Sequence, residues 1–199
     1  MNRTLLPLVA AISLFAIPAS AQSSFESPGD WGGVYVGFQA DLYAGNSLTF
    51  SDLPFVEGEI EGFNTGIFVG YLRQSGALVY GGEVEFLGGD VDSNVSIFGI
   101  PGAIDSYTTI TRFGGQVGYD AGRIMPYATA GLGLFSFQDT ANGDNRSLGT
   151  FAGLGVNVRV GEHASVGAEV IRHSFDDFSG SDTLGLELTT VGVNIAFRY

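Results

Sequence analysis

Runs of residues that alternate strictly between apolar and small or polar types recur along this chain. In the last run Val191, Val193, Ile195, Phe197 and Tyr199 share one parity. Successive side chains of a β-strand point to opposite faces, so each run predicts a strand with one apolar face. Eight such runs occur, at residues 33–43, 63–71, 78–86, 108–120, 126–137, 148–160, 164–173 and 189–199.

The segments between these runs alternate between long and short. Long connections are expected at 44–61, 88–106, 138–147 and 174–185, and short ones at 72–76, 120–123 and 161–163. In an up-and-down arrangement of antiparallel strands, every second connection lies at the same rim. Short turns at one rim and long loops at the other are typical of barrels that cross the outer membrane.

The second parity of the strands indicates which face lies inside. It carries mostly Gly, Asn, Gln and Thr, whereas a soluble sandwich or lipocalin-type barrel would present Lys and Glu to water. Small side chains suit the narrow bore of an eight-stranded barrel, so the apolar parity must face lipid. We predict an all-β fold, an eight-stranded antiparallel up-and-down transmembrane β-barrel. A soluble eight-stranded barrel is the alternative.

The N-terminal residues have the features of an export signal. Arg3 precedes an apolar stretch at 5–17 that is short for a membrane-spanning helix, and Ala19–Ala21 reads Ala-Ser-Ala. This order is typical of a cleavable signal peptide, and an uncleaved membrane anchor is the alternative. We expect a signal peptide at 1–21, an N-terminal periplasmic segment at 22–31 and the barrel at 32–199.

Charge and cysteine content exclude several classes of function. The net charge is −13, and all eight basic residues are arginine. Nucleic acid binding requires clustered positive charge, so nucleic acid is an unsuitable partner. The chain has no cysteine, which excludes disulfides and thiolate metal sites. We expect no cofactor.

Acidic residues gather in the predicted long connections, which hold Arg146 as their one basic residue. Carboxylate-rich loops can bind Ca²⁺ or Mg²⁺, but no segment has the spacing of a dedicated calcium loop. A solvated, solubilising surface is the simpler interpretation. The acids are Asp52, Glu57, Glu59, Glu61, Asp90, Asp92, Asp105, Asp139, Asp144, Asp176, Asp177 and Asp182.

Charged and amide side chains on the inward parity form a candidate interior cluster. Glu83 and Glu85 lie on the strand next to that of Arg112, and a charge in a narrow bore should be paired. We expect a Glu–Arg cluster with amides nearby and further interior charges at other depths. The cluster is interpreted as a plug that fixes register, or as a gate for small ions. Its members are Gln39, Asp41, Glu83, Glu85, Arg112, Gln116, Arg159, Glu169, Asn194 and Arg198.

Aromatic residues on the outward parity fall near the short-turn rim. Aromatic rings of this kind form girdles where a barrel meets the lipid headgroups. The last strand must also pair with the first, because an open edge is not tolerated in lipid. Tyr71, Tyr80, Tyr119, Phe197 and Tyr199 therefore form a predicted girdle, in which Phe197 and Tyr199 also complete the last strand.

The sequence resembles the eight-stranded OmpA-type and opacity-protein-like outer-membrane barrels of Gram-negative bacteria. The resemblance is carried by Trp31–Asp41 (WGGVYVGFQAD), Gly114–Asp120 (GGQVGYD), Pro126–Gly133 (PYATAGLG) and the final VNIAFRY. It implies a protein of the outer membrane, in contact with outer-membrane lipid and lipopolysaccharide. The terminal aromatic residue resembles the signal that such barrels present to the bacterial insertion machinery. Fold alone does not assign a reaction.

Three functions remain open from the sequence. The first is a non-enzymatic barrel that supports envelope integrity and presents acidic surface loops. The second is an adhesin or ligand-binding barrel, with a host or protein ligand held by the long loops. The third is a lipid A-modifying acyl hydrolase or transferase, for which His163 with Ser165 and Glu169, or His173 with nearby acids, would be candidates.

Overall fold

The computed structural model describes residues 30–43, 47–50, 56–97, 100–139, 143–175 and 184–199. All the regular elements in these ranges are strands, so the predicted all-β class is confirmed. No helix among the described residues is long and apolar enough to cross a membrane. The strands are β1 (Gly33–Tyr43), β2 (Ser47–Phe50), β3 (Val56–Ser75), β4 (Leu78–Ile97), β5 (Ile100–Tyr119), β6 (Ile124–Asp139), β7 (Gly143–Arg159), β8 (Ala164–Phe175) and β9 (Leu184–Arg198).

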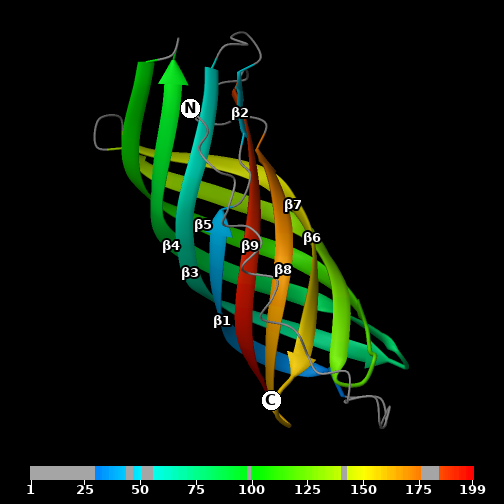
Figure 1. Cartoon of the computed structure of the whole chain (residues 1–199). Coiled ribbons are helices and arrows are strands. Elements are labelled where there is room, and N and C mark those ends of the chain that lie inside the picture. Colours follow the sequence, from blue (N-terminus) through cyan, green and yellow to red (C-terminus); the bar gives the residue numbers. More distant parts are fainter. Residues whose placement is uncertain (1–29, 44–46, 51–55, 98–99, 140–142, 176–183) are drawn as a thin grey trace, which may run out of the picture.

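The strands close into a single antiparallel ring (Figure 1). Each strand from β3 to β8 pairs with the next along the chain, and β1 pairs with both β3 and β9. The short strand β2 also pairs with β9, so β1 and β2 together occupy one position in the ring. The fold is therefore a closed eight-stranded up-and-down barrel, as predicted. Closure leaves the ring without a free edge, which a sheet in lipid requires.

The register around the ring makes the strands cross the barrel obliquely. A path of paired residues that starts at Gln74 on β3 and passes through every strand returns to β3 at Asn64, ten residues away. Such a stagger is coupled to a strong tilt of the strands. Residues far apart in sequence are thereby brought to the same depth, which matters for the interior described below.

Tight turns join the strands at one end of the barrel, here named the short-turn rim. The β3–β4 turn has Gly76 at φ 63° and the β5–β6 turn has Gly122 at φ 83°, backbone conformations that favour glycine. The β7–β8 turn lies beside the end of β9, because the amide of Arg198 donates to the carbonyl of His163 (2.8 Å). All three connections at this rim are short, as predicted, although β3 continues through most of the segment expected at 72–76 and ends at Ser75.

The predicted long connections are largely wrong, because pairing continues through most of them. β4 runs to Ile97 and β5 starts at Ile100, so the segment 88–106 is mostly a hairpin of paired strands. The segments 44–61 and 138–147 are likewise shortened by β2, β3, β6 and β7. Alternation of polarity marks only the part of a strand that separates lipid from the interior. Hydrogen bonding between neighbouring strands continues beyond it.

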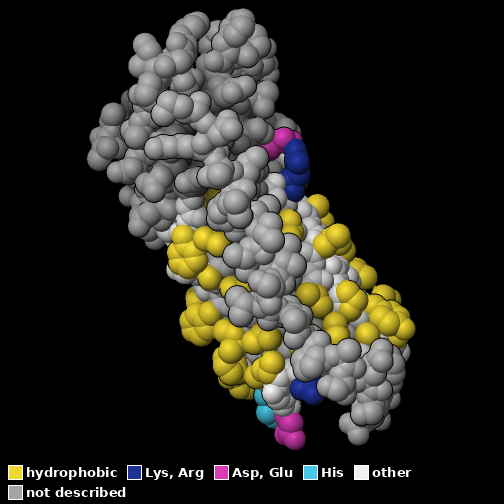
Figure 2. Space-filling model, in the orientation of Figure 1, with side chains coloured by type: hydrophobic (Ala, Val, Ile, Leu, Met, Phe, Trp, Pro, Cys, Tyr) yellow, Lys and Arg dark blue, Asp and Glu magenta, His cyan; other side chains and the backbone are white. Residues whose placement is uncertain are grey.

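The apolar parity faces outward along the described wall of the barrel. Phe38, Phe63, Val117, Leu132 and Leu154 are each at least half exposed, and Leu154 reaches 68%. Figure 2 shows hydrophobic side chains over much of the visible described wall. Exposed apolar surface of this extent is unsuitable for water, and it fits a lipid-facing band. The alternative of a soluble barrel with an apolar core made by this parity is excluded.

The adjacent glycines Gly81 and Gly82 on β4 provide a matched pair of substitutions. A Cβ at Gly81 would collide with the backbone carbonyl of Tyr71, whereas the atom nearest to a Cβ at Gly82 is the carbonyl oxygen of Gly114, at 3.4 Å. Gly81→Ala should lower the free energy of unfolding by about 1–3 kcal/mol, and Gly82→Ala should leave it nearly unchanged. Urea titration in detergent, followed by heat-modifiable gel migration, measures both. Equal midpoints for the two variants would contradict the assigned faces.

Candidate functional site: a sealed interior

The interior of the barrel is built in three layers along its length. The layer near the short-turn rim is aromatic and aliphatic, and it contains Trp31, Tyr35, Phe68, Leu72, Val79, Met125, Tyr127 and Ala196. A second apolar layer lies nearer the opposite rim, with Tyr43, Leu87, Ile110, Phe135, Phe175 and Leu188. Along β4, Glu83 and Glu85 fall between Val79 of the first layer and Leu87 of the second. A polar layer is therefore enclosed between two apolar ones.

Arg112 on β5 is the centre of the polar layer. Its guanidinium forms ion pairs with Glu85 of the neighbouring strand, with Asp41 of β1 (3.5 Å) and with Glu169 of β8 (3.3 Å). All four side chains are almost completely buried. A charge away from water is strongly disfavoured unless it is paired, so these contacts hold four strands in one relative register.

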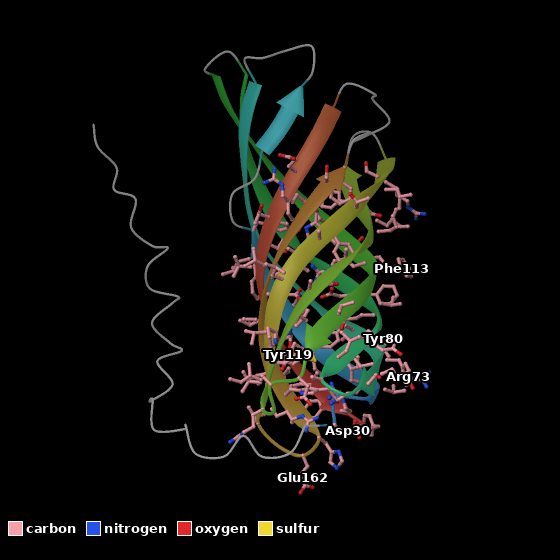
Figure 3. All side chains as sticks on the ribbon, turned by 90° about the vertical axis from the view of Figure 1, so that its right-hand side faces the viewer. Asp30, Arg73, Tyr80, Phe113, Tyr119 and Glu162 are labelled. Carbon is pink, nitrogen blue, oxygen red and sulfur yellow. The ribbon has the colours of Figure 1, made fainter. Side chains whose placement is uncertain are left out.

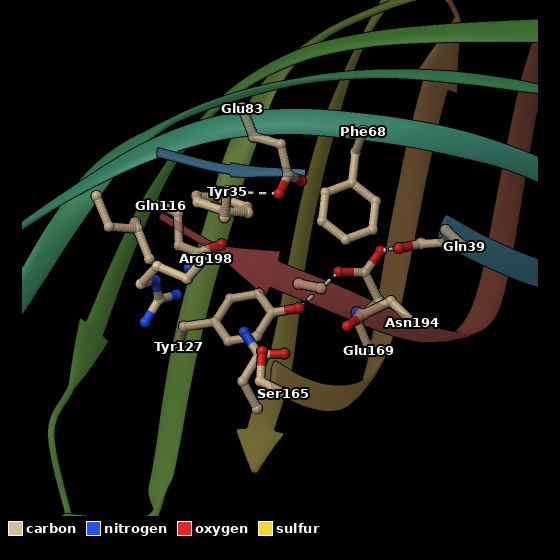
Figure 4. A pocket seen from close by; sticks show the side chains of 13 residues that line it. Tyr35, Gln39, Phe68, Glu83, Gln116, Tyr127, Ser165, Glu169, Asn194 and Arg198 are labelled. Carbon is tan, nitrogen blue, oxygen red and sulfur yellow. Dashed lines mark hydrogen bonds between the residues drawn. The ribbon is translucent and has the colours of Figure 1, made fainter. Parts of the chain in front are cut away.

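Amide and phenol groups extend the network around Glu169 (Figure 4). The Gln39 Nε2 donates to Asp41 (2.9 Å) and to Glu169 (2.6 Å), and the Tyr127 hydroxyl donates to the other oxygen of Glu169 (2.7 Å). The Tyr35 hydroxyl donates to Glu83 (2.8 Å). Both tyrosine rings belong to the apolar layer at the short-turn rim, so the two layers are bonded to each other.

Two small cavities lie within this network. One is lined by polar groups that include Gln116, Ser165 and Asn194, and the other lies beside Arg112 and Thr129. Each measures about 10 Å³, which is room for about one water molecule. They are consistent with single bound waters between polar side chains.

Trp31 closes the short-turn rim from inside. Its side chain is fully buried, its backbone amide donates to Gln74 (2.7 Å), and its indole Nε1 donates to Asp120 (3.1 Å). The guanidinium groups of Arg159 and Arg198 lie 4.6 Å and 5.2 Å from the ring centre, so the ring makes cation–π contacts with two arginines. Trp31, two residues before the start of β1, is thus part of the interior.

The structure divides the ten expected interior residues into groups. Asp41 and Glu169, which the sequence suggested at other depths, contact Arg112 directly together with Glu85. Gln39 and Glu83 join through the hydrogen bonds above, and Gln116 and Asn194 line a cavity. Arg159 and Arg198 lie against Trp31, and Arg198 also lines that cavity. Sequence reasoning missed Trp31, although a lone tryptophan before a first strand was a usable signal.

The histidine arrangements considered for catalysis are not assembled among the described residues. His163 is exposed in the β7–β8 turn, whereas Ser165 is buried inside the barrel and Glu169 belongs to the Arg112 network. His173 is fully buried and its ring is parallel to that of Phe175, with ring centres 6.3 Å apart. No hydrogen bond joins it to a described serine or carboxylate. Asp176 and Asp177 lie outside the described residues.

The remaining outward candidates have the following positions. Tyr71, Tyr80, Tyr119, Phe197 and Tyr199 are all exposed on the outer face towards the short-turn rim, and Figure 3 labels two of them.

In the described ranges no group of three or more His, Cys, Asp or Glu residues is arranged to hold a metal ion. Asp52 and Asp182 lie outside the described residues. Eight other predicted loop acids fall within strands β3 to β7.

Removal of the central guanidinium should be strongly destabilising. Arg112→Met leaves three buried carboxylates without their cation, and breaking a buried pair in this way costs about 3–5 kcal/mol. Arg172→Gln is the control, because Arg172 and its partner Glu187 are exposed on the outer face. Urea unfolding in detergent micelles measures both variants. Equal stability of Arg112→Met and the wild-type protein would contradict a structural role for the network.

Trp31 offers a direct spectroscopic measurement, because it is the single tryptophan of the chain. We expect blue-shifted emission and little quenching by iodide in the folded protein. Asp120→Ala removes the acceptor of the indole hydrogen bond, so it should increase quenching, whereas Glu162→Gln in the exposed β7–β8 turn should not. Strong quenching of the wild-type protein would show that the ring is not enclosed.

Comparisons with known proteins agree with this architecture. Residues 8–198 match the family model described as outer membrane protein beta-barrel domain. The 22 kDa outer membrane protein of Rhizobium leguminosarum bv. viciae is 27% identical over 182 residues, covering 86% of this chain and 79% of that protein.

Two solved structures share the fold. OprG from Pseudomonas aeruginosa has a TM-score of 0.55 at 13% identity, covering 87% of this chain and 99% of its own. Neisserial surface protein A has a TM-score of 0.54 at 15% identity, with 84% and 97% covered. The chain belongs to the outer membrane protein β-barrel domain family and is a β-barrel of the bacterial outer membrane.

Proposed function

We propose that this protein is a non-enzymatic, closed barrel that contributes to envelope integrity and presents acidic surface segments. The observation that carries the proposal is the layered interior, in which the Arg112 network lies between two apolar layers. Water and ions would have to cross both apolar layers to pass through. The barrel therefore blocks passage through its interior and holds the surface segments in the membrane.

In this proposal the polar layer fixes the register of the strands and does not open a path for ions. Its charges are bonded to one another across β1, β4, β5 and β8, and the cavities beside them have room for about one water each. A conduction path needs sites that an ion can enter and leave. Buried, mutually paired groups favour a fixed structure.

The rim opposite the short turns is the proposed display surface. In barrels of this class short turns face the periplasm, so the strand extensions beyond the apolar band face the outside of the cell. The paired strands β4 and β5 contain Asp90, Asp92 and Asp105 in this extension. Pairing between the strands holds the backbone at these acidic positions in place. A surface with a fixed backbone is suited to the alternative role, which is recognition of a host or protein ligand.

The remaining expectations complete the proposal. Residues 1–21 are a signal peptide and lie outside the described residues. Residues 22–31 lead from it to the barrel as a periplasmic segment, of which only Asp30 and Trp31 are described, and Trp31 itself belongs to the barrel interior. The girdle of Tyr71, Tyr80, Tyr119, Phe197 and Tyr199 lies at the headgroup layer of the periplasmic leaflet. The final aromatic residue is read by the insertion machinery.

Electrical recording tests the sealed interior. The purified protein in a planar lipid bilayer should pass no large, steady current. Trp31→Ala should also remain closed, because the apolar layer around Phe135 and Phe175 is untouched. Large and long-lived openings of the wild-type barrel would contradict the proposal, provided that samples without protein remain silent.

Analysis of lipid A tests the non-enzymatic part of the proposal. Mass spectra of lipid A should be the same for wild-type cells, for cells without the gene and for cells that carry His173→Ala. The reason is that His173 is enclosed by aromatic rings and forms no hydrogen bond with a described serine or carboxylate. Loss of a fatty acid that depends on the gene would reinstate the acyl-transfer hypothesis.

A further inference from the structure

The outer wall of the barrel contains a groove across β3, β4 and β5. Gly82 and Gly115 are directly paired and form its floor, and Val69, Val84 and Phe113 stand around it. The groove has a volume of about 380 Å³. A Cβ at Gly82 or Gly115 would meet no atom closer than 3.4 Å, so both glycines leave free space on the lipid side. The groove is thus a depression on the lipid-facing side, bordered by the apolar side chains of Val69, Val84 and Phe113. A larger hollow lies elsewhere on the outer wall, between β1, β3 and β9.

A cation lies beyond this groove, between it and the short-turn rim. Arg73 is exposed, and it is the cross-strand partner of Tyr80, two residues beyond Tyr71. In the described part of the chain its guanidinium has no carboxylate within ion-pair distance, in contrast to Arg172, which is paired with Glu187 at 2.6 Å. Figure 3 shows Phe113, Tyr80 and Arg73 projecting away from the barrel along the same side, with Arg73 nearest the short-turn rim.

We propose that this surface binds one phospholipid of the periplasmic leaflet. The planar guanidinium of Arg73 suits a phosphate through paired hydrogen bonds. The rings of Tyr71 and Tyr80 lie at the headgroup level, and one acyl chain occupies the groove over Gly82 and Gly115. The cation lies between the groove and the short turns, so the bound lipid belongs to the periplasmic leaflet and not to the lipopolysaccharide leaflet.

Native mass spectrometry of the full chain tests the site, with phosphatidylglycerol added to the detergent-solubilised protein. The wild-type protein should retain one lipid. Arg73→Gln should weaken retention about fivefold, the loss expected for one cation near an anionic headgroup. Gly82→Leu should abolish retention, because the leucine fills the groove. Ala168→Leu is the matched control, since it enlarges an outward residue on β8, away from the groove.

Two outcomes would overturn the proposal. Equal retention by the wild-type protein, Arg73→Gln and Gly82→Leu would show that no specific site exists. Competition by the water-soluble headgroup glycerophosphoglycerol at the same concentration as the lipid would show that the groove adds nothing. Heat-modifiable migration of each variant confirms that it is folded, so that loss of the lipid reports on the site.

Discussion

The closed ring of backbone hydrogen bonds is the constraint on which the rest of this structure depends. Lipid offers no partner for a free N–H or C=O, so the first strand must be joined to the last. Here β9 satisfies that requirement along β1, from the pair Tyr35–Arg198 to the pair Tyr43–Thr190. Once the ring is closed with a ten-residue stagger, the tilt and the narrow bore follow. The side chains on the outward face of each strand must then contact lipid, and those on the inward face must pack in a crowded interior.

The narrow bore explains the composition of the interior. Several large rings lie where the facing strand carries glycine, as where the Tyr35 ring lies against Gly70 and the Tyr127 ring against Gly155. The carboxylates of Asp41, Glu85 and Glu169 are buried in this bore, and they are paired with Arg112. With an apolar layer on each side, the same packing that stabilises the barrel also seals it. The proposed role as a wall is therefore a consequence of size as much as of chemistry.

The outer face shows how a barrel can interact specifically with its solvent. Much of it is covered by Val, Leu, Ile and Phe, but paired glycines at Gly82 and Gly115 leave a depression, and Arg73 nearby forms no ion pair with a described carboxylate. Asymmetry is also present at the two ends. Short turns, Trp31 and two arginines close one rim, whereas extended strand pairs continue at the other. The two rims are therefore suited to different surroundings.

The sequence by itself determined the class of fold, the apolar band of the eight strands, the faces of the alternating residues and a cluster of interior glutamates around Arg112. These depend on local alternation and on neighbouring strands, which a short stretch of chain encodes. Only the tertiary structure decided that Asp41 and Glu169 meet the same guanidinium, because that depends on register summed around the ring. It also decided that Trp31 turns back into the barrel and that strand pairing outlasts the apolar band. Those outcomes arise from closure, in which the position of each strand is set by all the others.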